Sequence, residues 1–419
     1  MKQRIIRSYN KLKTTNILSN FFNLSSIQIS NIILLFITIR IITGSIGING
    51  LGLVMFAYRF SLLAGAVINY GTNQSGVRET VYNLSDGQKL GVVFYNILFI
   101  RAIIFVLFAI GIFGFYFFHV DYYSFILLSV PVVLAEVLNP LCFFIGTEKL
   151  KIFNGYNLVA NVVAALAIFF FVTGPEKAIW VNFILGTGNV ITYSGLLFYV
   201  VRRYKLSFQW PLKADLLRMG KDNFYLTVNN ISANLQQSII IFALKWNSSA
   251  LLGAYTLCDR VMSQCRNLLN IIGNAIYPNA VNLYRESTKA WIAYRRKSKQ
   301  LLTVVFLAGA IVIFILADFI VYILSKQHDQ NAIALLRIMA IVPIISASNV
   351  INVLDQLIKN STANLFRISS ILLVVSLVAA VLIARFGNYI LVGGFTVIIE
   401  ICALFLSEYF IKKPAVNNA

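Results

Sequence analysis

The chain contains a series of apolar runs, each close to the length that a helix needs to cross a bilayer. About 20 apolar residues span the ~30 Å of hydrocarbon, and lipid offers no partner for backbone polar groups, so these runs must be helical. Barrel strands would be about half as long and would alternate in polarity. The runs cover residues 18–43, 50–72, 90–118, 122–146, 152–173, 178–201, 223–244, 250–276, 300–324, 331–353, 366–386 and 388–411. They predict an all-α integral membrane protein of about 12 transmembrane helices.

The basic residues are distributed unevenly between the two ends of these helices. With a cytoplasmic amino terminus, the inner segments hold 25 Lys and Arg and the outer loops hold 4. Such a bias is the positive-inside signal of a multi-pass membrane protein. It accounts for the net charge of +20 without a nucleic-acid partner. We therefore expect both termini to face the cytoplasm.

The two longest inner segments, 202–222 and 277–299, are basic and contain Trp210 and Trp291. Aromatic and cationic side chains suit an anionic membrane surface, so we expect both segments to lie there as amphipathic stretches. The first of them divides the chain into six helices before it and six after it. The predicted organisation is an N-terminal lobe (1–201), a cytoplasmic linker (202–222) and a C-terminal lobe (223–419).

The two halves share a spacing that indicates an internal duplication. Gly52 precedes Arg59 by the same interval that separates Gly253 from Arg260, and a leucine precedes each glycine. Each half also carries an Arg-Glu pair after its second helix. Internal repeats are common in transporters, where the substrate site lies between the repeats.

Polar residues recur along one face of several apolar helices. Facing lipid, they would each cost free energy, so these faces must contact protein or water. Interhelical hydrogen bonding would explain one or two such residues, whereas five or six in register favour a hydrated cavity. The stripes are Asn223, Thr227, Asn230, Asn234 and Gln237; Thr256, Arg260, Ser263, Asn267, Asn270 and Asn274, with Gln264 beside them; and Asn16, Ser19, Asn23, Ser26 and Ser30.

Arginines inside membrane helices are functional candidates, because burying each one is costly. Arg59 and Arg260 occupy matching mid-helix positions, and their guanidinium groups could hold a pyrophosphate-bearing substrate. Arg40 is a further cavity candidate, unless it extends to the membrane surface. A structural role is favoured for Arg101 and Arg337.

Two acidic residues are candidates for ion coupling. Glu136 lies between Pro131 and Pro140, where prolines free backbone carbonyls and kink a helix; it could relay protons, bind Na⁺ or pair with an internal arginine such as Arg59. Asp259 lies seven residues before Arg266, which predicts an ion pair between them. No cofactor, metal-ligand spacing or phosphate-binding loop is expected from the sequence, and an enzymatic role is not favoured.

The chain resembles the O-antigen and related polysaccharide flippases (Wzx type) of the multidrug/oligosaccharidyl-lipid/polysaccharide (MOP) exporter superfamily. The segments that carry the resemblance are Gly50–Ala57 with Tyr70-Gly71, Pro140 with Phe144–Lys151, Gly253–Tyr255 with Arg260, and Ala275–Pro278. The resemblance implies two six-helix lobes around a cavity lined by the first, second, seventh and eighth helices. It also implies an alternating-access flippase of a bacterial inner membrane, which moves an undecaprenyl-pyrophosphate-linked oligosaccharide to the outer leaflet. Membrane lipids, a polysaccharide polymerase and a chain-length regulator are the implied partners.

Two other functions are compatible with parts of this pattern. An ion-coupled drug antiporter of the same superfamily would be expected to place carboxylates in its cavity, whereas this chain offers arginines and amides. A polysaccharide polymerase or ligase would be expected to carry a large outer loop, and the loops here are short. The sequence therefore favours the flippase.

Overall fold

The computed structural model describes residues 2–117, 122–246, 248–359 and 361–412. Side-chain surroundings are described from Ser30 onward, except at 115, 229, 274–275, 277–279, 282, 285 and 362. The helices are α1 (Lys2–Asn69), α2 (Thr72–Asn83), α3 (Gly87–Phe117), α4 (Tyr123–Leu127), α5 (Val130–Leu138), α6 (Leu141–Gly146), α7 (Leu150–Phe171), η1 (Pro175–Lys177), α8 (Trp180–Tyr204), α9 (Lys213–Lys245), α10 (Ser249–Glu286), α11 (Thr288–Ile315), α12 (Ala317–Ser325), α13 (Gln330–Met339), α14 (Val342–Ile358), α15 (Thr362–Phe386) and α16 (Tyr389–Lys412).

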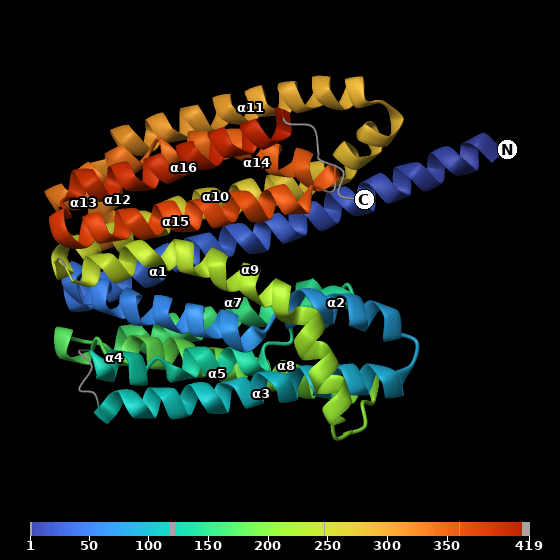
Figure 1. Cartoon of the computed structure of the whole chain (residues 1–419), viewed down its shortest axis with the longest axis horizontal. Coiled ribbons are helices and arrows are strands. Elements are labelled where there is room, and N and C mark those ends of the chain that lie inside the picture. The colour runs from blue at the N-terminus through green and yellow to red at the C-terminus, as the bar shows by residue number, and fades with distance from the viewer. Residues whose placement is uncertain (1, 118–121, 247, 360, 413–419) are drawn as a thin grey trace.

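The first two predicted membrane helices form one continuous element with a reversal at Gly47. This residue has φ 73° and ψ 174°, a conformation that glycine adopts without a steric penalty. The chain runs away from the amino terminus before Gly47 and returns after it (Figure 1). We call the part of α1 before Gly47 its first leg and the part after Gly47 its second leg.

Nine described helical segments are long and apolar enough to cross a membrane. One of them, Ser30–Asn69, contains both legs of α1, while α9 and α10 are too polar to qualify because they carry the polar stripes. Adding the second leg, α9 and α10 to the nine reproduces the predicted helices. An all-helical membrane protein with about 12 spans is therefore confirmed. Large apolar side chains such as Leu107, Phe170 and Val381 are exposed on its outer surface, as lipid contact requires.

The two legs of α1 lie between two groups of helices (Figure 1). Helices α2–α8 form one group, the N-terminal lobe with α1, and α9–α16 form the C-terminal lobe. α1 contacts α9, α10 and α12 across the boundary between lobes. The first residues of α1 and the last residues of α16 lie at the same end of the bundle, here called the terminal end; the opposite end is called the Gly47 end (Figure 1).

The fourth predicted helix is broken twice, at its two prolines. α4, α5 and α6 together occupy residues 123–146, and Pro131 and Pro140 lie at the two breaks. Proline lacks the N–H that would continue the helical hydrogen-bond pattern. The kinks expected at these prolines are thus present, and the second one contributes to the site described below.

The segment 277–299 is expected to lie on the membrane surface as an amphipathic stretch. In the structure it forms the end of α10 and the start of α11, and the expected surface position of Trp291 is wrong. Ser287 alone separates α10 from α11, and its side chain caps α11 by accepting a hydrogen bond from the Ala290 backbone N–H. Trp291 is fully buried, and its indole Nε1 donates to Asp355 Oδ1 at 2.6 Å. A buried indole needs such an acceptor, and Asp355 is too distant in sequence to be anticipated. Trp210, by contrast, is exposed.

Candidate functional site

The two lobes come into close backbone contact where Gly52 of the second leg meets Gly253 of α10. A Cβ atom on Gly52 would lie 2.8 Å from the Gly253 backbone nitrogen, and one on Gly253 would lie 2.1 Å from the Ile48 carbonyl oxygen. Small residues permit such backbone contact between membrane helices. These glycines are the equivalent positions of the predicted repeat, so the two halves meet through matching segments.

Arg59 crosses from the second leg to the C-terminal lobe. Its Nη2 lies 2.8 Å from Asp259 Oδ2, and its Nη1 lies 3.5 Å from Gln237 Oε1 on α9. The other carboxylate oxygen of Asp259 accepts from Arg266 Nη2 at 2.8 Å, so the predicted Asp259–Arg266 pair is present. Asp259 is therefore held between an arginine of each lobe. The alternative partner considered for Arg59, Glu136, is not the one it uses.

Arg260 crosses the boundary the other way, from α10 of the C-terminal lobe to the second leg of α1. Its guanidinium carbon lies 5.2 Å from the ring centroid of Tyr58, and its Nη2 donates to Met55 Sδ at 3.0 Å. Tyr58 directly precedes Arg59 and Asp259 directly precedes Arg260, so these two residues occupy equivalent positions in the two halves. Arg59 contacts Asp259, and its counterpart Arg260 contacts Tyr58. The arrangement has a two-fold relationship in position but not in charge. Within the described part of the chain, Arg260 forms no ion pair with a carboxylate, although Asp259 lies near it.

A polar cavity of about 260 Å³ lies between the lobes toward the terminal end. Asn230 and Asn234 of α9 face it, together with Glu136 of α5. The amides of Gln74 and Asn230 exchange two hydrogen bonds of 3.2 Å across the lobe boundary. The remaining lining residues are Leu62, Gly65, Ala66, Asn69 and Asn73. Amides carry both donors and acceptors, so this surface can bind hydroxyl-rich groups.

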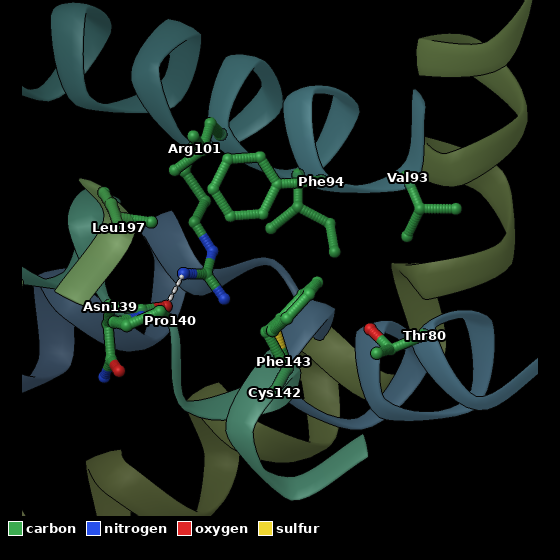
Figure 2. A pocket seen from close by; sticks show the side chains of 11 residues that line it. Thr80, Val93, Phe94, Arg101, Asn139, Pro140, Cys142, Phe143 and Leu197 are labelled. Atoms are coloured by element: carbon green, nitrogen blue, oxygen red, sulfur yellow. Dashed lines mark hydrogen bonds between the residues drawn. The ribbon is translucent and has the colours of Figure 1, made fainter. Parts of the chain in front are cut away.

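Arg101 of α3 organises the wall behind this cavity. Because residue 140 is a proline, the Glu136 carbonyl lacks its helical donor. Arg101 Nη1 donates to that carbonyl at 3.2 Å and to the Asn139 carbonyl at 2.7 Å; Figure 2 shows the second bond. Its Nε reaches Thr72 Oγ1 at 2.7 Å. The space beside it is only about 10 Å³, too small for a ligand.

A third set of contacts closes the lobes against each other near the Gly47 end. Arg40 Nη1 donates to the Ile323 carbonyl, and Thr43 Oγ1 donates to the Leu324 carbonyl. The Lys245 ammonium lies 5.0 Å from the Phe56 ring centroid and 4.9 Å from that of Tyr122. The hydrogen bond described for Arg40 therefore belongs to this closure and is not shared with the other predicted site residues whose side chains are described.

The remaining predicted site residues lie on α10, beyond Arg260. Gln264 is buried, and its Nε2 donates to Ser263 Oγ at 3.2 Å. Asn267 donates from Nδ2 to Gln264 Oε1 at 3.3 Å. Asn274 and the motif residues Ala275, Tyr277 and Pro278 have side chains outside the described set, as do Asn16, Ser19, Asn23 and Ser26.

Sequence reasoning did not identify Tyr58, Met55, Gln74, Asn69 or Asn73 as site residues. Tyr58 and Met55 could have been found by placing the two repeats opposite each other, since both precede Arg59 within one turn or so of helix. Asn69, Asn73 and Gln74 flank the turn at Tyr70-Gly71, where both residues have positive φ. No group of metal-ligating side chains occurs among the described residues.

Several solved transporters have a similar arrangement of helices. An inward-facing multidrug resistance MATE family transporter of the MOP superfamily is 13% identical with a TM-score of 0.68, over 92% of this chain and 96% of that one. A MOP superfamily transporter from Pyrococcus furiosus is 12% identical with a TM-score of 0.63, over 94% and 96%. The multidrug transporter DinF-BH is 16% identical with a TM-score of 0.54, over 93% and 94%.

The chain is thus a multi-pass membrane protein with the fold of the MOP superfamily of transporters. Its sequence matches the polysaccharide biosynthesis protein family over residues 17–284, and the chain belongs to that family. Curated protein sequences gave no significant match. The predicted resemblance is confirmed at the level of the fold and of the polysaccharide biosynthesis protein family.

Proposed function

We propose that this protein is a flippase for a lipid-linked oligosaccharide carried on undecaprenyl pyrophosphate. The observation that carries the proposal is Arg260, a membrane-embedded arginine at the lobe boundary. It contacts an aromatic ring and a thioether and forms no ion pair with a carboxylate of the described residues. A guanidinium group left with positive charge in such a place suits a phosphate, which it can bind through two parallel hydrogen bonds.

The polar cavity would receive part of the saccharide, at a distance from Arg260, which is not among its lining residues. Asn230 and Asn234 would donate to and accept from sugar hydroxyls, and Gln74 would do the same once its pairing with Asn230 opens. Arg59 and Gln237 lie between the cavity and Arg260 along the lobe boundary. The polyprenyl chain would remain in the bilayer while the polar headgroup crosses between the lobes.

In alternating access, the lobes would separate at one end of the bundle while they close at the other. In the structure, contacts involving Arg40, Thr43 and Lys245 join the lobes near the Gly47 end. We place the terminal end in the cytoplasm of a bacterial cell, on the grounds of the positive-inside pattern. The headgroup would enter from that side and leave when the Gly47-end contacts separate. Glu136, which faces the cavity, is the candidate ion-coupling residue.

The test is complementation in a strain from which the gene has been deleted. We expect the deletion to accumulate lipid-linked oligosaccharide on the cytoplasmic face, and Arg260→Gln to fail to restore surface polysaccharide while reaching normal membrane levels. Arg337→Gln is the matched control, because Arg337 is also a membrane-helix arginine over an aromatic ring, 5.7 Å from Phe314, but within the C-terminal lobe. Full complementation by Arg260→Gln would reject Arg260 as the phosphate ligand. Drug sensitivity of the deletion strain without saccharide accumulation would reject the flippase in favour of a drug antiporter.

A further inference from the structure

Asp259 occupies an unusual place among the charges at the lobe boundary. Its two carboxylate oxygens lie 2.8 Å from Arg59 of one lobe and 2.8 Å from Arg266 of its own helix. The carboxylate is almost completely buried, with 8% of the side chain exposed. Glu400 of α16 is a second acidic neighbour of Arg266. The charged groups that face Asp259 are therefore Arg59, Arg260 and Arg266, with Glu400 behind Arg266.

The repeat relationship shows that this carboxylate is a departure from symmetry. The position equivalent to Asp259 in the first half is Tyr58, which offers Arg260 a ring face in place of a negative charge. Arg59 therefore already forms an ion pair with Asp259, whereas Arg260 lies near that carboxylate and forms no ion pair with it. A phosphate entering between the lobes meets one guanidinium, that of Arg260, without an ion pair among the described residues, and one, that of Arg59, which it can reach only by displacing a carboxylate.

We propose that Asp259 is a resident counter-ion, which holds Arg59 until the pyrophosphate of the substrate replaces it. This inference rests on the proposed function. The exchange leaves no buried carboxylate unpaired, because Asp259 keeps its bond to Arg266 when Arg59 leaves. The exchange also couples phosphate binding to the separation of the lobes. The Arg59–Asp259 ion pair joins the N-terminal lobe to the C-terminal lobe, and the phosphate breaks it.

The exchange makes a quantitative prediction for phosphate affinity. Binding of farnesyl pyrophosphate, a soluble polyprenyl pyrophosphate, would be measured by calorimetry on the full chain in lipid nanodiscs. Asp259→Asn removes the competing anion, so we expect affinity to rise about tenfold, the equivalent of one charge-assisted hydrogen bond. Glu400→Gln removes a negative charge near Arg266 rather than the one paired with Arg59, and we expect it to change affinity much less.

A double substitution separates the exchange from a general field effect. In an Arg59→Gln background, Asp259→Asn should no longer tighten binding, because the carboxylate acts through Arg59. Tightening that persists without Arg59, equal tightening by Glu400→Gln, or weaker binding in Asp259→Asn would each overturn the inference.

The same point can be tested with Asp259 intact, in case its removal prevents folding. Arg260→Gln should weaken binding by about tenfold or more, and Arg59→Gln by less than about threefold, because only Arg59 must give up a carboxylate to bind phosphate. Equal losses from the two variants would reject the counter-ion role and leave the proposed function standing. Undiminished binding in Arg260→Gln would reject the phosphate site itself, and the inference with it.

Discussion

Gly52 and Gly253 lie against each other at the boundary between the lobes, with a Cβ on Gly52 falling 2.8 Å from the Gly253 backbone nitrogen. Equivalent positions in the two halves meet at this contact. The arginines seven residues further along each helix therefore face the opposite half, and Arg59 reaches Asp259 while Arg260 reaches Tyr58. A close backbone contact thus determines where the candidate site forms.

Enlarging these glycines should prevent the lobes from closing near the Gly47 end. A Cβ on Gly253 would be 2.1 Å from the Ile48 carbonyl oxygen, so Gly253→Ala must move one backbone away from the other. We expect this variant to insert normally and to lose surface polysaccharide in the complementation assay. Gly309→Ala on α11, where a Cβ meets nothing within 4 Å, should retain function. A functional Gly253→Ala protein would show that this contact is dispensable.

Cysteine labelling should separate the cavity from the packed face of the same helix. Cysteines at Asn230 and Asn234, in a chain lacking the four native cysteines, should react with small water-soluble thiol reagents because both positions line the cavity. A cysteine at Ile239, which is buried in the apolar core, should not react. Reaction rates would be followed by a mass shift. Equal rates at all three positions would favour interhelical hydrogen bonding over a hydrated cavity.

Arg101 should support stability and contribute nothing directly to phosphate binding. Its guanidinium satisfies the Glu136 and Asn139 carbonyls at the proline break, so Arg101→Leu leaves buried acceptors without donors. We expect the free energy of unfolding to fall by about 2–5 kcal/mol, seen as a lower melting temperature in detergent. Arg337→Leu, at an exposed position, is the control and should change little. A wild-type melting temperature for Arg101→Leu would contradict the structural role.

The orientation of the bundle can be tested by reporter fusions. Fusions within residues 205–212 and after Lys412 should report a cytoplasmic location, because the basic residues gather at the terminal end. Fusions at Lys177 and Gln327 should report the opposite side, since each lies at a turn near the Gly47 end. A cytoplasmic signal from Gln327 would invert the proposed direction of transport.

Much of this protein is determined by periodicity along the chain. Apolar length identified the membrane-spanning helices, though not the more polar α2. Steps of three and four residues placed Asn230 and Asn234 on one face of α9, where both line the cavity. The Asp259–Arg266 pair was predictable for the same reason, because residues seven apart on a helix share a face. The break at Pro140 followed from the missing proline N–H.

Only the tertiary structure decided which of these faces meet. Arg59 was considered as a partner of Glu136, yet its guanidinium pairs with Asp259, two hundred residues away, because the Gly52–Gly253 contact sets the register of α1 against α10. Trp291, expected at the membrane surface, is buried and donates a hydrogen bond to Asp355, because the packing of α11 against α14 brings the two side chains together. Periodicity along a helix reports which residues share a face, but the partner of that face depends on how closely two backbones can approach.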